Sequence, residues 1–268
     1  MKMMIIISSA LLAGGACEAN LTPQPMLDAS LPACVPNGQG TITADELPIV
    51  LGATLPYYAG SNRTVNLVAN SEGVYDLSVQ SPSDVVVNVG PVGLGSQWYA
   101  SAYPMGQFVV DAGSGLDGIY HQDATALWLD GTASQQENPA AGETLVQYAE
   151  PIALLRFPLM DGQSYSTTEA LVATTIDGLP LVGSDEYTTD VTLGAQLAVP
   201  YVDFSPVLRV RTNVIRTPST GTPVVNKRTT LFMFQCFGEI ARAESNEDEP
   251  NADFTTAAYL RRYALGQQ

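Results

Sequence analysis

Hydrophobic and polar side chains alternate along much of this chain, and that two-residue period constrains the fold more than any other feature of the sequence. It is clearest at 74–79, where Tyr75, Leu77 and Val79 alternate with Asp76 and Ser78, and at 85–89, which is valine at every position but one. Successive side chains of a strand point to opposite faces of a sheet. The segment 207–216 sends Leu208 and Val210 to one face and Arg209 to the other, which is typical of antiparallel sheets.

Turn signals separate the alternating segments. Asp177-Gly178 is the strongest hairpin signal, and the Asp-Gly pairs at 161–162 and 130–131 resemble it. The fold class predicted is therefore all-β: an antiparallel β-sandwich or a curved half-barrel with few short helices, one of them near 44–47. Further strands are expected at 107–111, 126–129, 153–157, 171–176, 187–193, 207–217 and 229–237. The segment 254–265 is either an amphipathic helix or, as its threonines and tyrosines favour, a strand that forms a hairpin with 238–244.

The composition indicates a folded protein that does not bind nucleic acid. Hydrophobic residues make up 46% of the 268 residues, enough to offset the entropy of ordering the chain. The 11 Lys and Arg against 27 Asp and Glu give a net charge of -16, and the only lysines are Lys2 and Lys227. Because DNA and RNA binding requires clustered basic side chains, this composition argues against a nucleic-acid partner.

The first 16 residues have the pattern of a secretory signal peptide. Lys2 is followed by the apolar stretch 3–12 and by small residues up to Ala16. The uncharged run 3–16 has 14 residues, which is short of the roughly 20 that a membrane-spanning helix needs. The sequence therefore predicts export, with residues 1–16 removed.

Gly14-Gly15-Ala16-Cys17 resembles the lipobox of bacterial lipoproteins. Segments 155–165 and 234–242 are similar to strand-turn-strand parts of secreted β-rich lipoproteins whose role is unassigned. The resemblance implies that Cys17 carries lipid and anchors the protein to the outer membrane or cell surface. Gly14 stands where that family usually has leucine, so cleavage by the ordinary signal peptidase, giving a periplasmic or secreted protein, stays open.

The three cysteines agree with export. If Cys17 carries the lipid, Cys34 and Cys236 remain as one pair, which can form a disulfide in an oxidising compartment. A disulfide between them would close a loop of about 200 residues and contribute roughly 5 kcal/mol. Two free buried thiols are the alternative. We expect 17–36, which has no periodicity, to be a tether before one extracytoplasmic β-rich domain at 37–268.

A subdivision of that domain near residue 151 stays open. Residues 1–155 carry 2 basic and 14 acidic side chains, a net charge of -12. Residues 156–268 carry 9 and 13, a net charge of -4. The densest charge lies at 244–253, which is expected to be a solvated hairpin tip.

The segment 37–46 resembles the second half of an EF-hand loop, with Asn37, Gln39 and Glu46 at ligand positions. Val35 stands where such a loop begins with Asp, and only Glu46 brings a charge. We therefore expect a turn that keeps the shape without the ion. No cofactor is predicted, and Ca²⁺ is the one candidate.

Few residues of the sequence are candidates for catalysis. His121, the single histidine, lies in the Gly- and Asp-rich segment 115–123 and is expected to be an exposed turn residue. No Gly-x-Ser-x-Gly motif is present. Paired carboxylates of a glycan hydrolase stay open as an alternative, because the chain has 27 acidic residues. The sequence predicts no catalytic residue and no enzyme.

Five aromatic residues gather in one stretch and are candidates for lining a sugar or lipid cleft, or else for core packing. They are Trp98, Tyr99, Tyr103, Tyr120 and Trp128.

The expected function is that of a cell-envelope protein acting as a non-catalytic binding or structural module. A glycan or another envelope component is a candidate partner. The alternatives are a carrier of an apolar ligand in a curved sheet, which would show a concave surface lined with aliphatic side chains, and the glycan hydrolase. The sequence does not set the ligand or the oligomeric state.

Overall fold

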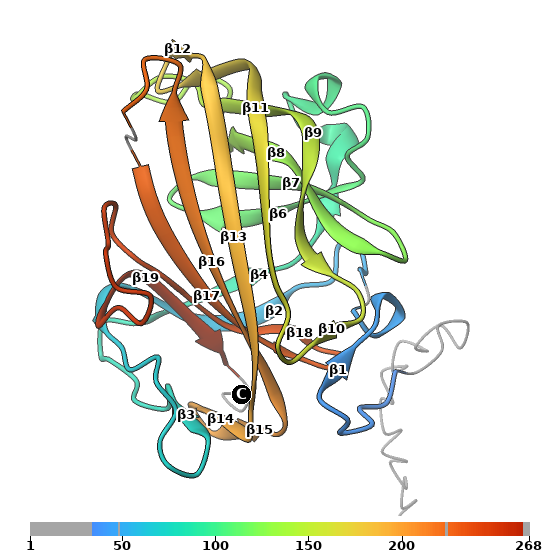
Figure 1. Ribbon diagram of the computed structural model, residues 1–268, viewed down its shortest axis with the longest axis vertical. Coiled ribbons are helices and arrows are strands. Elements are labelled where there is room, and N and C mark those ends of the chain that lie inside the picture. Colours follow the sequence, from blue (N-terminus) through green and yellow to red (C-terminus); the bar gives the residue numbers. More distant parts are fainter. Residues whose placement is uncertain (1–33, 48, 223–224, 265–268) are drawn as a thin grey trace, which may run out of the picture. The chain divides into compact units, whose positions relative to one another are not determined.

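The computed structural model describes residues 34–47, 49–222 and 225–264 (Figure 1). The helical segments in these residues are short 3-10 turns: η1 (Ala44–Glu46), η2 (Leu94–Ser96) and η3 (Ala100–Ala102). The strands are β1 (Thr41–Ile42), β2 (Leu55–Thr64), β3 (Val74–Asp76), β4 (Val85–Val89), β5 (Val92–Gly93), β6 (Phe108–Gly113), β7 (Leu116–Gln122), β8 (Ala126–Ser134), β9 (Leu145–Arg156), β10 (Leu159–Met160), β11 (Ser164–Ile176), β12 (Leu179–Leu181), β13 (Gly183–Gly194), β14 (Gln196–Val199), β15 (Val202–Phe204), β16 (Val207–Pro218), β17 (Val225–Phe234), β18 (Gly238–Glu244) and β19 (Thr256–Tyr263). The fold class is all-β, as the alternation predicts.

One large sheet contains most of these strands. Its order is β4-β2-β19-β18-β17-β16-β13-β11-β9-β8-β7-β6-β5, with β12 paired to β11 beside this path. Neighbouring strands in it are antiparallel, and the longest pairing joins β13 to β16 over their whole lengths. The end strands β4 and β5 are not paired with each other. Figure 1 shows the result, a curved sheet that does not close on itself.

The two faces of the central strands pack against different layers. On the outer face, Val207 and Phe232 join a core with Tyr75 and Leu197, which belong to the small sheet β15-β14-β3. On the inner face, Leu208 and Met233 pack with Ile42 and Leu47 of the N-terminal segment. Both faces of these central strands are therefore covered. This explains why their side chains are apolar on both faces, although an antiparallel sheet often has one polar face.

Strands β6 to β9 show the same division. Phe108 and Tyr120 belong to the inner cluster. Val109 and Ile119, one residue away on the same two strands, belong to a cluster on the other face that residues 94–103 cover. Each strand therefore contributes to the inner surface of the curve and to an outer layer.

The disulfide between Cys34 and Cys236 is present, with the two Cα atoms 5.5 Å apart, so the predicted pairing is confirmed. It joins the first described residue to the turn between β17 and β18. Cys236 also donates its backbone N–H to the carbonyl of Glu46, at 2.9 Å. The N-terminal segment is thus fixed to the middle of the large sheet by a covalent bond and a hydrogen bond.

Several strand predictions are confirmed. The segment 85–89 is β4, Asp177-Gly178 forms the turn between β11 and β12, and β18 pairs with β19 as the expected C-terminal hairpin. Others are wrong. Asp130-Gly131 lies inside β8 at an irregular point of the register and is not a hairpin turn, and 115–123 is mostly strand β7.

Residues from Cys34 onward form one compact unit without a division near 151. The predicted signal peptide, Cys17 and most of the tether lie outside the described residues. In the part of the chain that the structure describes, none of the helical segments has the length and apolar character needed to cross a membrane.

Candidate ligand-binding cavity

A cavity with a volume of about 440 Å³ lies on the inner side of the curved sheet. It is bounded by strands from both ends of that sheet, with β2, β18 and β19 on one side and β6, β7 and β9 on the other. The segment 47–55, which packs against the sheet, completes the wall. The apolar part of the lining includes Leu55, Phe108, Val110, Leu154, Leu231 and Met233.

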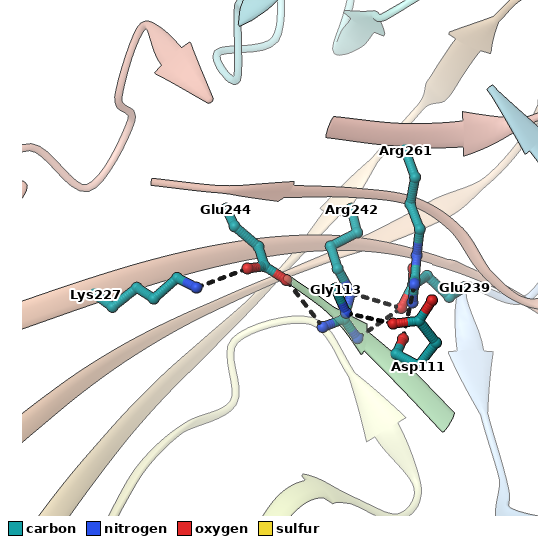
Figure 2. Close-up of polar contacts among 7 residues, drawn as sticks. All are labelled: Asp111, Gly113, Lys227, Glu239, Arg242, Glu244 and Arg261. Carbon is teal, nitrogen blue, oxygen red and sulfur yellow. Dashed lines mark hydrogen bonds and ion pairs between the residues drawn. The ribbon is translucent and has the colours of Figure 1, made fainter. Parts of the chain in front are cut away.

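Three charged side chains interrupt this apolar wall: Glu239 and Arg242 on β18 and Arg261 on β19. The register places Arg242 directly opposite Arg261, and two adjacent cations would repel each other. Glu239 lies between them (Figure 2). Its Oε2 accepts hydrogen bonds from Arg242 Nη2 at 2.8 Å and Nε at 3.1 Å, and its Oε1 accepts one from Arg261 Nε at 2.5 Å.

A β-bulge makes this arrangement possible. The register between β17 and β18 shifts between Phe232 and Met233, so that Ala241 pairs with Phe232 and Glu239 pairs with Met233. In a regular strand, residues 239 and 242 would point to opposite faces. The extra residue, Ile240, is buried in the outer core, and Glu239 therefore shares the inner face with Arg242.

From Glu239 and Arg242 the cluster continues to Lys227 in one direction and to Asp111 in the other (Figure 2). Glu244 accepts a hydrogen bond from Lys227 at 2.8 Å and a longer one from Arg242 at 3.5 Å. Arg261 donates from Nη1 to the backbone carbonyl of Asp111 on β6, at 3.0 Å. This last bond connects β19 to a strand at the other end of the sheet.

Burial and charge compete in setting the ionisation of these groups. Burial favours the neutral form of Glu239, but Arg242 and Arg261 outweigh it and lower the pKa of Glu239 to about 2. Burial likewise opposes the charge on Arg242, but Glu239 and Glu244 raise the pKa of Arg242 above its usual value. All three side chains are therefore ionised at neutral pH.

Two tyrosines complete the polar part of the wall. Tyr57 donates from its hydroxyl to the carbonyl of Glu239, at 2.7 Å. Tyr120 on β7 is 9% exposed, stacks on Phe108 and lines the cavity. Its hydroxyl lies over Gly118, where a Cβ would come within 2.2 Å of the oxygen. Within the described residues, this hydroxyl makes no hydrogen bond, and unlike the fully buried unpaired hydroxyl of Tyr58 it is accessible from the cavity.

A second buried polar cluster lies on the inner face of β13 and β16. Arg216 makes two hydrogen bonds to Asp185, at 2.8 and 2.7 Å, and Tyr148 donates to the same carboxylate at 3.0 Å. Tyr187 is 2.9 Å from the Tyr148 hydroxyl. The charges of this cluster are fully paired, so it is a structural element rather than a binding site.

The five aromatic candidates do not form one cleft. Trp98, Tyr99 and Tyr103 make edge-to-face contacts with one another in an outer core cluster. Trp128 stacks on His121 with the ring centroids 5.9 Å apart. Of the five, Tyr120 alone lines the cavity, and the others serve packing.

The EF-hand-like residues have local structural partners. Glu46 caps η1, because its Oε2 accepts from the backbone N–H of Thr43 at 2.9 Å. Its Oε1 accepts from Gln235 at 2.7 Å and from Asn37 at 3.2 Å, while the side-chain Oδ1 of Asn37 accepts from the backbone N–H of Gln39 at 2.9 Å. In the described ranges, no group of three or more His, Cys, Asp or Glu side chains could hold a metal ion.

His121 is not the exposed turn residue that the sequence predicts. It lies on β7 with 13% of its side chain exposed, and its Nδ1 is 2.8 Å from Asp130. Burial, which outweighs the hydrogen bond to His121, raises the pKa of Asp130. The alternation within 115–123 could have revealed β7, but the glycines at 115 and 118 favoured a loop.

A smaller cleft of about 180 Å³ lies on the outer face of β13, β16 and β17, with Arg211, Asn213 and Arg228 in its lining. It is polar, and Arg211 is paired with Asp253 at 3.4 Å. The acidic segment 244–253 is thus only partly the solvated tip that the sequence predicts. Its residues 246–248 are exposed, but Glu244 and Ser245 are buried and Asp253 also pairs with Arg209 at 3.0 Å.

Comparisons with known proteins find no relative. A scan against protein-family models, a search of curated proteins and a search of solved structures each gave no match. The fold and the site therefore define the class by themselves: an all-β protein whose curved antiparallel sheet surrounds an apolar cavity with a charged patch on its wall.

Proposed function

We propose that this protein is a non-catalytic binding protein of the cell envelope that carries an apolar ligand in its cavity. The observation that carries this proposal is the cavity itself, whose volume of about 440 Å³ is in the range of small-molecule sites, roughly 300–1,000 Å³. Its lining is mostly aliphatic and aromatic. An apolar ligand would gain free energy from leaving water for such a site.

The charged groups of the cavity suit binding better than catalysis. Both oxygens of Glu239 accept hydrogen bonds from arginines, and its pKa of about 2 makes it a weak base at neutral pH. A glycan hydrolase needs a carboxylic acid with a raised pKa beside a second carboxylate at a suitable separation. Glu239 has the opposite shift.

The cellular location is part of the proposal. The leader at 1–16, with Lys2 before an apolar stretch, supports export, and the Cys34–Cys236 disulfide is the kind of bond that persists in an oxidising compartment. We place the protein outside the cytoplasm, attached to a membrane by lipid on Cys17. Intact-mass measurement of the native protein tests this directly, since an unprocessed leader would contradict export and an unmodified mature N-terminus would contradict the anchor.

Ligand binding is tested by calorimetric titration of the purified protein with dodecanol, a neutral apolar probe. We expect saturable binding at one site. Val110→Trp, which places a large side chain into the cavity, should abolish the binding. Val85→Trp is the matched control, because Val85 is 59% exposed on β4, and it should bind like the wild type. Equal binding by the two variants, or no binding of dodecanol or of charged analogues by the wild type, would contradict the proposal.

A further inference from the structure

The lining of the cavity holds one more positive than negative charge. Arg242 and Arg261 bring two positive charges to the lining and Glu239 brings one negative charge, so the charged residues that line the cavity have a net charge of +1. Glu244 lies behind the lining and is shared between Lys227, at 2.8 Å, and Arg242, at 3.5 Å. A ligand with one negative charge would balance the charge of the lining itself.

The arginines are fixed in place rather than free to leave the site. Arg261 has only 2% of its side chain exposed and is held by Glu239 and by the Asp111 carbonyl. Arg242 is held by Glu239 and Glu244 on the same strand. Because neither guanidinium can turn out to solvent without breaking these bonds, the excess positive charge stays at the cavity wall.

Tyr120 supplies a second, independent feature that points to a ligand. Its side chain is nine-tenths buried and belongs to the opposite wall of the same cavity, yet its hydroxyl has no hydrogen-bond partner within the described residues. Burial raises the pKa of this hydroxyl, and the charges of the arginine–glutamate cluster act on it with opposite signs. A hydroxyl without a protein partner thus faces the same cavity as the two arginines.

We propose that the ligand of this cavity is a long-chain carboxylate, whose head accepts a hydrogen bond from the Tyr120 hydroxyl and lies against Arg242 while its chain fills the apolar part. This inference rests on the proposed function and names its ligand class. One negative charge balances the net charge of +1, and one acceptor satisfies the free hydroxyl. The chain would lie against Leu154, Leu231 and Met233.

The same features disfavour other head groups. A phosphate monoester carries a charge of about -1.5 to -2 and three strong acceptor oxygens, more than one net charge and one free donor can compensate. A cationic head would be repelled by the arginines. A neutral alcohol would leave the positive charge unbalanced.

The test is a titration with probes that share one chain and differ in the head: dodecanoate, dodecanol, dodecyl phosphate and dodecyltrimethylammonium. We expect dodecanoate to bind at least about tenfold more tightly than dodecanol, because hydrogen bonds to charged groups are the stronger ones. Dodecyl phosphate should bind more weakly than dodecanoate, and the ammonium probe most weakly of all.

Tyr120→Phe tests the position of the head without disturbing the fold, because the hydroxyl that it removes has no partner in the protein. We expect about tenfold weaker binding of dodecanoate and unchanged binding of dodecanol. Tyr201→Phe is the control, since Tyr201 is 67% exposed and does not line the cavity, and it should change neither.

The outcomes separate the two proposals. Equal binding of dodecanoate and dodecanol would overturn the carboxylate while leaving an apolar carrier. Tightest binding of the phosphate or the ammonium probe would also overturn it, as would an unchanged dodecanoate affinity in Tyr120→Phe. Failure of all four probes to bind would overturn the apolar carrier itself.

Discussion

Glu239 is the residue on which the cavity wall depends, because it alone contacts both arginines. Its pKa of about 2, against 4.5 for the free side chain, means that folding is favoured while Glu239 is ionised. The contribution is fully present above pH 4.5 and is lost as the pH falls toward 2. The shift corresponds to roughly 3 kcal/mol of unfolding free energy.

We therefore predict that Glu239→Gln is less stable than the wild type at pH 6 and that the difference shrinks as the pH falls below about 4.5. Urea unfolding at a series of pH values measures both. Glu137→Gln, at an exposed loop position, serves as the control and should follow the wild type. A stability difference that stays constant down to pH 2.5 would show that Glu239 is not held ionised by the arginines.

Asp185 and Arg216 give a second prediction, since this pair is buried and Asp185 is fully inaccessible. Asp185→Asn should cost about 3–5 kcal/mol because it leaves the Arg216 charge without a partner. Asp185→Leu combined with Arg216→Met should recover much of that loss, because it removes both charges. Urea unfolding of the three proteins measures this, and a double variant no more stable than Asp185→Asn would contradict the explanation.

The sequence could predict the chemistry of single residues only where counting or the neighbours along the chain decide it. The pairing of Cys34 with Cys236 follows from counting the cysteines. The spacing of Glu46 from Thr43 could have indicated its capping role, whereas the EF-hand resemblance gave Glu46 a ligand position. The partner of His121, however, is Asp130 and not an acidic residue in its own segment, because β7 and β8 form a hairpin that brings them together.

At the scale of elements, alternation predicted strands where it is unbroken and failed where a proline or glycine interrupts it. β4 is a run of valines and was located correctly. β2 was missed, because Pro56, Gly60 and Asn62 are typical of turns, and Asn62 does adopt a positive φ of 52°. The bulge at Ile240 could not be predicted either, since it depends on the outer core that buries this side chain.

The disulfide attaches the N-terminal segment to the turn between β17 and β18, and the effect of this bond on stability can be measured. Reduction and alkylation of Cys34 and Cys236, which are 202 residues apart, should lower the free energy of unfolding by up to about 5 kcal/mol, mainly by giving the unfolded chain more freedom. Urea unfolding of the oxidised and reduced proteins checks it. A reduced protein as stable as the oxidised one would show that this bond does not restrain the unfolded state.

At the scale of the whole molecule, the cavity lies between the two ends of one sheet that does not close. The hydrogen bond from Arg261 to the Asp111 carbonyl, at 3.0 Å, connects these ends directly. Leu47 of the N-terminal segment lines the cavity beside Met233 of the central strands. The sequence could not predict the cavity, because its lining comes from strands far apart in the chain. A ligand that contacts both ends should therefore stabilise them together.

Hydrogen exchange can test this coupling with dodecanoate at about 100 times its Kd, where binding adds roughly 2.7 kcal/mol to the free energy of global unfolding. Amides of β6 and β7 and those of β18 and β19 should exchange more slowly together, because the ligand is released whenever either end opens. Locally opening amides of β14 and β15, on the outer face, should change less. If protection increased only in β18 and β19, the ligand would be held by one wall, and the opposite wall with Tyr120 would have no part in binding.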